Sequence, residues 1–291
     1  MADQVAEACE RIGFFYAVNH GVPEATVDAT FGEARRFFAL PEEERLKIRL
    51  DNRHRGYMPL YHTTIPTYKA NRVRSFELAL DLPPDDPDVL AGKPLHAGNV
   101  WPDLPGFRPV LERYYAETCG FGFQLLKAFA VALGMPEDFF QKLYAGKPLA
   151  SMRLLNYPPP PAGAEEYGVA PHSDYGILTI LKQDEVGGLE LFTQQGDWIA
   201  APVVPGSFVI NIGDLMSIWT NGRFTSMQHR VVNRAGRDRI SIPIFYNPRY
   251  DTVIECLPTC RSAETPPRYE PKVMGDYLIS NFRTAWESYK K

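Results

Sequence analysis

The run Ile240-Ser-Ile-Pro-Ile-Phe-Tyr-Asn247 decides the fold class, because it is short and rich in β-branched and aromatic residues. Five comparable runs precede it, separated by Gly, Pro or Asn turns: MRLLNY (152–157), ILTILKQ (177–183), LELFT (189–193), SFVINI (207–212) and QHRVVN (228–233). Many short strands at near-regular spacing are typical of a β-sandwich or barrel, and we favour a double-sheet jelly roll, also called a double-stranded β-helix.

The segments around these runs have helical periodicity. Apolar residues recur at three- and four-residue spacing in four segments, which we expect to be helices: 2–12, 24–39, 107–133 and 271–288. Residues 50–106 are rich in Pro, Gly and Asp, and we expect one strand there, at 75–81, and otherwise loop.

The whole chain is expected to form one mainly β domain with flanking helices, covering residues 1–291. Its parts would be a helical N-terminal region (1–150), the jelly-roll core (151–255), and a C-terminal helix and tail (256–291). The change near residue 150 separates a helical scaffold from a β core, so we do not expect two independent domains.

Composition restricts the partners. The 291 residues carry a net charge of −4, which argues against nucleic acid or an anionic membrane, because such binding depends on concentrated positive charge. No apolar run is long enough to cross a bilayer, and residues 1–15 lack the pattern of a signal peptide. Four scattered cysteines suggest no disulfide framework. We expect a cytoplasmic monomer that acts on a small molecule.

One of six histidines, His172, has an acid two places later, Asp174. This pattern alone is weak, because chance produces it easily in a chain with 35 acidic residues. In a strand, however, both side chains would project from one face. His229 follows 55 residues after Asp174 in another strand-like run, which we expect to be a strand facing that of His172. Two His and one carboxylate on one face of a metal leave open positions and are typical of Fe(II) oxygenases.

A possible anion-binding pair follows ten residues after His229. Arg239 and Ser241 alternate at the start of a strand, so both should lie on one face, together with Pro243 and Phe245. A guanidinium fork and a hydroxyl suit a carboxylate that must be fixed in position. A surface arginine on an edge strand is the alternative if the spacing has no meaning.

The pattern H-x-D, a later histidine in H-R-V, and R-x-S ten residues on resembles the isopenicillin N synthase-like 2-oxoglutarate-dependent oxygenases. The resemblance spans almost the whole chain, with matching pieces in the expected order: Gly13-Phe-Phe-Tyr-Ala-Val-Asn-His-Gly21, Leu155-Asn-Tyr-Pro158, Val209-Ile-Asn-Ile-Gly-Asp214 and Thr220-Asn-Gly-Arg-Phe224. The form H-x-D-Y-G looks most like bacterial members, a group that includes the ethylene-forming enzyme.

The resemblance implies an iron site and a cosubstrate site. His172, Asp174 and His229 would bind Fe(II). Arg239 and Ser241, helped by the Tyr157 hydroxyl, would hold the far carboxylate of 2-oxoglutarate, whose keto end reaches the iron. With dioxygen, and with ascorbate as a candidate reductant, decarboxylation to succinate and carbon dioxide would drive hydroxylation, desaturation or another oxidation of a small molecule.

The chain departs from the family pattern in two places. The family usually opens with a short strand before its first helix, whereas this chain begins within that helix, so we expect that edge strand to be absent, shortened or replaced. Many plant relatives have Asn two places before the tyrosine of the Y-P motif, where this chain has Leu155. One polar contact to 2-oxoglutarate is therefore not expected.

The sequence indicates the residues of the substrate pocket less clearly than those of the iron site. Phe245 should point inward, as pocket wall or core. Arg153 shares a strand face with Tyr157 and is a candidate contact for an anionic substrate. Tyr57 belongs to a loop that folds over the site in relatives. Among the loop histidines, only His62 is a candidate for the pocket.

Two other functions remain open from sequence alone. An Fe(II) oxidase of the same fold need not use 2-oxoglutarate, because isopenicillin N synthase and the plant ethylene-forming oxidase share R-x-S. Stoichiometric succinate release would separate the two. A non-catalytic jelly-roll binding protein is disfavoured, because a binding module does not need an open metal face.

Overall fold

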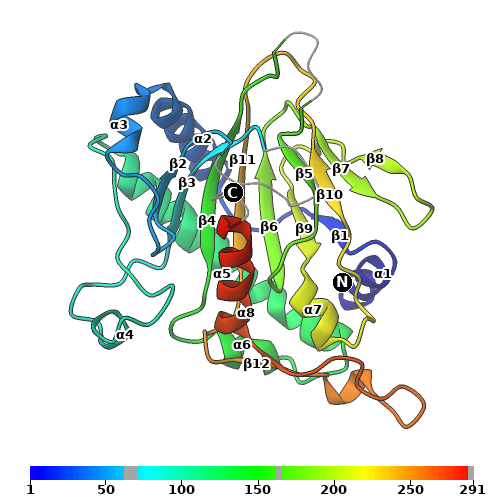
Figure 1. Ribbon diagram of the computed structural model, residues 1–291. Helices are drawn as coiled ribbons and strands as arrows, with labels where there is room; N and C mark the ends of the chain where they lie inside the picture. Colours follow the sequence, from blue (N-terminus) through cyan, green and yellow to red (C-terminus); the bar gives the residue numbers. More distant parts are fainter. Residues whose placement is uncertain (62–70, 162–165, 288–291) are drawn as a thin grey trace.

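The computed structural model describes residues 1–61, 71–161 and 166–287, most of whose strands form two large antiparallel sheets (Figure 1). The larger has seven strands in the order β1 (Phe14–Ala17), β9 (Phe208–Ile212), β6 (Leu178–Gln183), β11 (Arg239–Tyr246), β4 (Ser151–Tyr157), β3 (Arg74–Ala79) and β2 (Gly56–Met58). The smaller has four, in the order β5 (Val169–His172), β10 (His229–Val231), β7 (Leu189–Phe192) and β8 (Trp198–Ala200).

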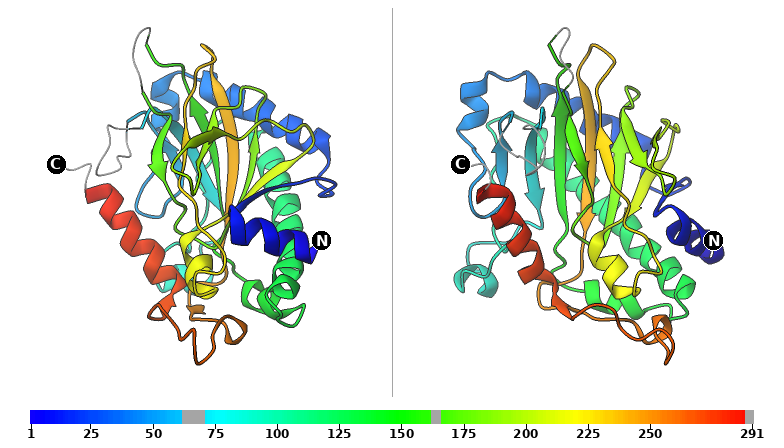
Figure 2. Two further views of the ribbon diagram at one scale, coloured as in Figure 1. Left: turned by 90° about the vertical axis from the view of Figure 1, so that its right-hand side faces the viewer. Right: turned by 45° about the vertical axis from the view of Figure 1, so that its right-hand side comes forward.

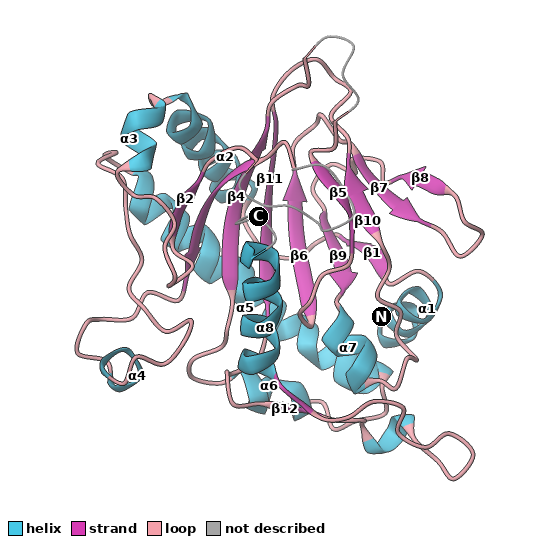
Figure 3. Ribbon diagram, in the orientation of Figure 1, coloured by secondary structure: helices cyan, strands magenta, loops and turns pink. Residues whose placement is uncertain are grey.

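Helices cover the outside of the larger sheet and one end of the molecule (Figure 3). The helices of the described segments are α1 (Ala2–Arg11), α2 (Glu24–Ala39), α3 (Glu42–Leu46), α4 (Pro87–Leu90), α5 (Phe107–Ala132), α6 (Phe139–Tyr144), α7 (Asp214–Trp219) and α8 (Met274–Glu287). The 3-10 turn η1 (Pro258–Cys260) and the strand pair β12 (Val253–Ile254) and β13 (Lys272–Val273) precede α8. Figure 2 shows α8 on the opposite side of the sheets from α5. No helix of the described segments is long and apolar enough to cross a membrane.

The helix α5 packs against the larger sheet through one face. Its buried residues recur at three- and four-residue steps, the period of one helical face: Leu111, Tyr114, Thr118, Gly122, Leu125 and Phe129. A Cβ on Gly122 would lie 2.8 Å from Ile180 and 3.0 Å from the Tyr246 ring. Glycine therefore lets the helix approach β6 and β11 without displacing these two side chains.

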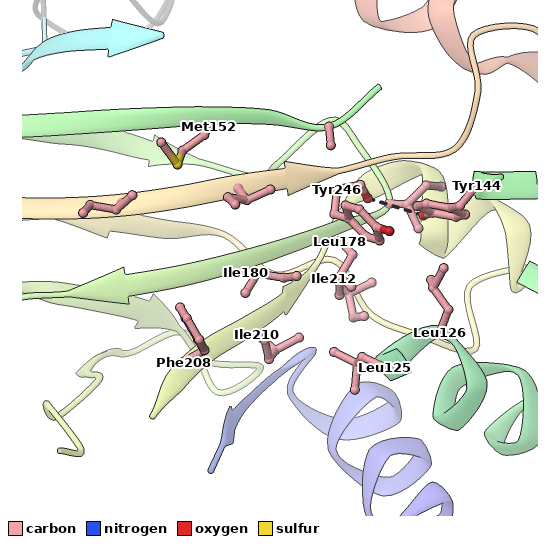
Figure 4. Packing of buried hydrophobic residues seen from close by; sticks show 14 of the residues in the cluster. Leu125, Leu126, Tyr144, Met152, Leu178, Ile180, Phe208, Ile210, Ile212 and Tyr246 are labelled. Carbon is pink, nitrogen blue, oxygen red and sulfur yellow. Dashed lines mark hydrogen bonds between the residues drawn. The ribbon is translucent and has the colours of Figure 1, made fainter. Parts of the chain in front are cut away.

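The strand β11 divides its side chains between this core and the interior of the jelly roll. Its even-numbered residues, Ile240, Ile242, Ile244 and Tyr246, belong to the cluster packed with α5. Figure 4 shows side chains of β4, β6, β9 and β11 in one cluster with Leu125 and Leu126 of α5. The odd-numbered residues line a cavity between the two sheets. Because side chains alternate along a strand, the even-numbered residues of β11 pack in the core and the odd-numbered residues face the cavity.

The jelly-roll prediction is confirmed, because each of the six predicted runs contains an observed strand and the larger sheet lies against flanking helices. The helices expected at 2–12, 24–39 and 107–133 are α1, α2 and α5. The last helix begins at Met274, because residues 272–273 pair with β12; residue 288 lies outside the described residues.

Two expectations about the first half of the chain are wrong. Residues 1–150 contain two strands besides the predicted one, since β1 and β2 join β3 in the larger sheet, with β1 at its edge beside β9. Residues 50–106 contain β2 and α4 in addition to the predicted strand. Strands of three or four residues are too short to display an alternating pattern, so sequence periodicity misses them.

Candidate active site

The side chains of His172, Asp174 and His229 lie close together at the end of the smaller sheet where β5 ends and β10 begins. His172 ends β5 and His229 begins β10, and the two are direct cross-strand partners with ring centroids 4.3 Å apart. Their Nε2 atoms lie 3.9 and 3.8 Å from Oδ1 of Asp174. One ligand atom from each of the three residues lies within 4.8 Å of the others. Among the described residues they form the one group suited to a metal ion.

The route to this geometry differs from the expected one in two respects. His229 is on the neighbouring strand of the same sheet, not on a facing strand. Asp174 lies beyond the end of β5, so strand alternation does not align it with His172. Instead its backbone carbonyl accepts a hydrogen bond from the N–H of Asp214 (2.8 Å), which ties the turn after β5 to the start of α7.

Backbone carbonyls orient both imidazoles. Nδ1 of His172 lies 2.8 Å from the carbonyl of Ala170, and Nδ1 of His229 lies 3.3 Å from that of Met227. A carbonyl only accepts, so each Nδ1 carries a proton, and Nε2, the nitrogen that faces Asp174, presents a lone pair whenever the ring is neutral. This is the arrangement that metal-bound histidines use.

The electrostatics keep His172 and Asp174 in the forms that bind metal. Burial, together with the positive charge that His229 can carry, lowers the pKa of His172 to about 4, so this imidazole is neutral at neutral pH. Burial alone would raise the pKa of Asp174, but the two histidines and hydrogen bonds outweigh it, and the net shift is downward. A neutral imidazole and an ionised carboxylate bind a cation without first losing a proton.

Asp174 offers one oxygen because its other oxygen is occupied. Oδ2 accepts hydrogen bonds from Thr179 Oγ1 (2.6 Å) and Asn211 Nδ2 (2.7 Å) on β6 and β9 of the larger sheet. Oδ1 therefore faces the two Nε2 atoms. Two imidazoles and one monodentate carboxylate on one side of a site are the donor set of non-haem Fe(II) enzymes, so these residues fit iron.

Removing the two supports of Asp174 should weaken metal binding without removing a ligand. In the double variant Thr179→Val, Asn211→Leu, we expect Fe(II) affinity to fall about 10- to 100-fold, because partners that orient ligands contribute on that scale. Anaerobic Fe(II) titration against a chromogenic chelator measures this. Thr193→Val, outside the cavity, is the control; unchanged Fe(II) affinity in the double variant would contradict the assigned role.

Arg239, Ser241 and Tyr157 meet deeper in the same cavity. Arg239 on β11 pairs in register with Tyr157 on β4, and its guanidinium carbon lies 4.7 Å from the Tyr157 ring. Nη1 of Arg239 donates to Ser241 Oγ (3.1 Å), which is 3.4 Å from the Tyr157 hydroxyl. Nη2 donates to Gln183 Oε1 (3.3 Å), and Nε donates to the carbonyl of Gly187.

The guanidinium of Arg239 forms no direct ion pair with a carboxylate of the described residues, although Asp184 lies close enough for Arg239 to offset part of the rise that burial causes in the pKa of its carboxyl. The side chain is fully buried, and all its hydrogen-bond acceptors within the described residues are neutral oxygens. Isolating a charge from water is costly unless a counter-ion is present. A ligand carboxylate in the cavity would supply that counter-ion, and the hydroxyls of Ser241 and Tyr157 stand beside it.

The cavity has a volume of about 280 Å³ and extends from Arg239 past the two histidines and the aspartate to Arg153 and Phe245. At about 10–15 Å³ for each water-sized group, this is room for roughly twenty non-hydrogen atoms. Arg153 and Phe245, both candidates for the substrate pocket, thus lie on the cavity wall. His62 lies outside the described residues.

Tyr57 was assigned to the pocket incorrectly. The segment is not a loop but strand β2, and on a strand neighbouring side chains point to opposite faces. Met58 lines the cavity, whereas Tyr57 is fully buried on the other side, 5.9 Å from the Phe37 ring of α2 and beneath the guanidinium of Arg45.

Several cavity residues escaped the sequence analysis. Glu77 lies in the predicted strand 75–81, and alternation along β3 could have identified its inward direction. His54 and Arg55 come from an irregular turn without a pattern. Leu278 and Phe282 of α8 also line the cavity, and an amphipathic helix alone does not reveal what its apolar face covers.

Comparisons with known proteins agree with this geometry. Residues 149–248 match the 2OG-Fe(II) oxygenase superfamily, and residues 1–104 match the N-terminal region of non-haem dioxygenases in morphine synthesis. Kihadalactone A synthase of Citrus sinensis is 35% identical over 95% of this chain and 86% of its own.

Solved structures give the same result. A 2OG-Fe(II) oxygenase family protein from Caulobacter crescentus has a TM-score of 0.87 and 33% identity, covering 97% of this chain and 93% of its own. A full-length Neurospora crassa protein in complex with alpha-KG, a synonym of 2-oxoglutarate, has a TM-score of 0.85 and 26% identity, covering 97% and 90%. With the site geometry, these matches establish that the chain belongs to the 2OG-Fe(II) oxygenase superfamily.

Proposed function

We propose that His172, Asp174 and His229 bind Fe(II), and that Arg239 and Ser241, with the Tyr157 hydroxyl, bind the far carboxylate of 2-oxoglutarate. The protein is a non-haem iron dioxygenase that uses Fe(II) and 2-oxoglutarate to oxidise a small molecule. The observation that carries the residue assignment is the buried guanidinium of Arg239, whose acceptors in the described segments are all neutral.

In the reaction, the protein itself positions the cosubstrate and the substrate and excludes water from the site. Iron and 2-oxoglutarate supply the oxidising power when bound, and decarboxylation with dioxygen yields succinate and carbon dioxide. Arg239 fixes one end of the cosubstrate through a bidentate fork, while Ser241 donates to the same carboxylate. The largely apolar walls of the cavity limit the water around the reacting atoms once substrate is bound, so that oxidation is directed at the substrate.

We also propose a finer classification. The H-x-D-Y-G form at 172–176 and the R-x-S at 239–241 support an isopenicillin N synthase-like member of bacterial type. One main hydrophobic cluster contains residues from Val5 to Leu278, which supports a single domain over 1–291. We also propose that the protein is a cytoplasmic monomer; the free state of all four cysteines supports a reducing compartment.

Succinate release tests the proposed function. The protein is incubated with Fe(II), ascorbate, dioxygen and 2-oxoglutarate, with a library of small metabolites added one pool at a time. We expect at least one pool to raise succinate above the substrate-free level, with one succinate formed for each oxidised product. Omitting Fe(II) or 2-oxoglutarate should remove both signals. An oxidised product formed without succinate would favour a 2-oxoglutarate-independent oxidase instead.

A further inference from the structure

The far end of the cavity from Arg239 contains a second guanidinium, that of Arg153. On β4, the side chains of Tyr157, Leu155 and Arg153 line the cavity in turn. Tyr157 pairs in register with Arg239, and Arg153 lies four residues along, about 13 Å at roughly 3.3 Å per residue. This separation exceeds the length of a five-carbon diacid, so 2-oxoglutarate held by Arg239 does not also occupy Arg153.

Arg153 is held in place on two sides but keeps its terminal nitrogens available. Its cross-strand partner on β3 is Glu77, and Nε of Arg153 lies 3.1 Å from Oε1 of that buried carboxylate. The guanidinium also covers the ring of Phe245, 5.1 Å from its centroid. Its side chain is 26% exposed, although it lines the interior cavity. Within the described residues, Nη1 and Nη2 have no hydrogen-bond acceptor.

Among the described residues that line this end of the cavity, arginines outnumber carboxylates by one. Arg55 also lines it and is buried, and its guanidinium donates to the backbone carbonyls of Arg53, His54 and Leu95. Asp51 and Asp81 also act on Arg55, but they lie outside the lining and are paired with Arg53 and Arg108. Lys147 is already paired with two aspartates outside the cavity lining. Apart from Asp174, Glu77 is the one carboxylate among the described lining residues. Two guanidiniums thus face a single carboxylate.

The remaining wall at this end is apolar. It is made by side chains from β2, from the segments around α4, and from α8: Met58, Leu80, Leu82, Leu95, Leu278 and Phe282. Apolar walls with a few fixed polar groups are typical of sites that bind a mostly apolar ligand in one orientation. The polar groups here select the charge of the ligand.

We propose that the substrate is a monocarboxylate with an apolar body, and that Arg153 binds its carboxylate while Arg55 adds positive charge behind it. The inference rests on the proposed function, because it takes His172, Asp174 and His229 as the reaction centre. The one arginine in excess among the lining residues is balanced by one monoanion. A phosphate monoester, nearly a dianion at neutral pH, would leave excess negative charge beside the buried Glu77. The planar fork of Arg153 also matches a carboxylate.

The test compares each acid with its own uncharged amide. The wild-type protein is loaded anaerobically with Fe(II) and 2-oxoglutarate, and binding is measured by calorimetry for a panel of matched pairs. The panel contains 3-phenylpropanoate with 3-phenylpropanamide, octanoate with octanamide, and further pairs of similar size. We expect at least one acid to bind tenfold or more tightly than its amide. If no acid in the panel is preferred, the inference is overturned.

Two variants with opposite expected effects on acid binding distinguish a direct role of Arg153 from general damage to the fold. Arg153→Gln should reduce the preference for acid to less than about threefold, because the fork and its charge are lost. Glu77→Gln removes the competing carboxylate and should tighten acid binding, a gain that a merely damaged fold would not give. Arg237→Gln, on an exposed arginine, is the charge control. An acid preference that survives unchanged in Arg153→Gln would overturn the inference.

A second readout keeps this test independent of the proposed function. The metal-to-ligand charge-transfer band that 2-oxoglutarate produces with Fe(II) is recorded for every protein before the ligands are added. If the wild-type protein shows no band, the proposed function itself fails. If the band is present but acids bind no better than amides, only the monocarboxylate inference fails.

Discussion

Replacing His229 with Ala should abolish iron-dependent turnover and leave the protein unable to retain Fe(II). Only His172 and Asp174 would remain, and two ligands hold a labile divalent ion poorly. Since partners that merely orient a ligand contribute about 10- to 100-fold, loss of a ligand should reduce turnover by more than about a hundredfold. The same result is expected for His172→Ala, because the two imidazoles are equivalent cross-strand partners. Iron content after anaerobic loading, with succinate formation, measures the effect.

His20→Gln is the matched control for this experiment. Its ring packs against Phe208, 4.4 Å between centroids, outside the residues that line the cavity. Iron content in this variant should equal that of the wild-type protein. If His229→Ala or His172→Ala keeps both normal iron content and normal turnover, the metal is bound elsewhere.

Arg239→Ala should weaken 2-oxoglutarate binding strongly while leaving iron content near normal. Removing one partner of a desolvated charge pair costs on the order of 2–5 kcal/mol. This corresponds to a rise in the cosubstrate dissociation constant of roughly thirtyfold or more, since about 1.4 kcal/mol is tenfold. Arg239→Lys keeps the charge but loses the bidentate fork, so its effect should be smaller. Anaerobic titration of the Fe(II) protein, followed by the charge-transfer band, gives each constant directly.

Arg230→Lys is a suitable control, because Arg230 follows His229 on β10 but is outside the cavity lining and pairs with Glu190. It should bind 2-oxoglutarate as tightly as the wild-type protein. A dissociation constant unchanged in Arg239→Ala would mean that the far carboxylate sits elsewhere in the cavity.

The sequence predicted the parts of the site that depend on strand alternation. Arg239, Ser241 and Phe245 share a face of β11 as expected, because a period of two is a local property of any strand. The proximity of His172 to His229 could not be derived in the same way. It depends on the pairing of β5 with β10, two strands far apart in the chain, which the motif resemblance indicated but local physics did not.

Other features depend on tertiary packing and have no local signal. Tyr57 was misplaced because β2 is a strand only through its pairing with β3. A proline in a strand with neighbours on both sides is unfavourable, yet Pro243 lies in β11 between β4 and β6. The register with β4 runs from Arg239 to Ser241 and resumes at Ile244. The pairing between β11 and β4 is thus interrupted opposite Arg153. Residue preferences for strands would not predict this local break.

The two faces of β11 also restrict how this chain can change its length during evolution. A shift of one residue in the strand would turn every side chain to the opposite face. Arg239 and Ser241 would then enter the apolar core beneath α5, while Ile240 and Ile242 would face the cavity. Burying an unpaired guanidinium among aliphatic side chains costs several kcal/mol. Single-residue insertions and deletions are therefore excluded from the strand, and new specificities must arise by substitution there or by length changes in the surrounding loops.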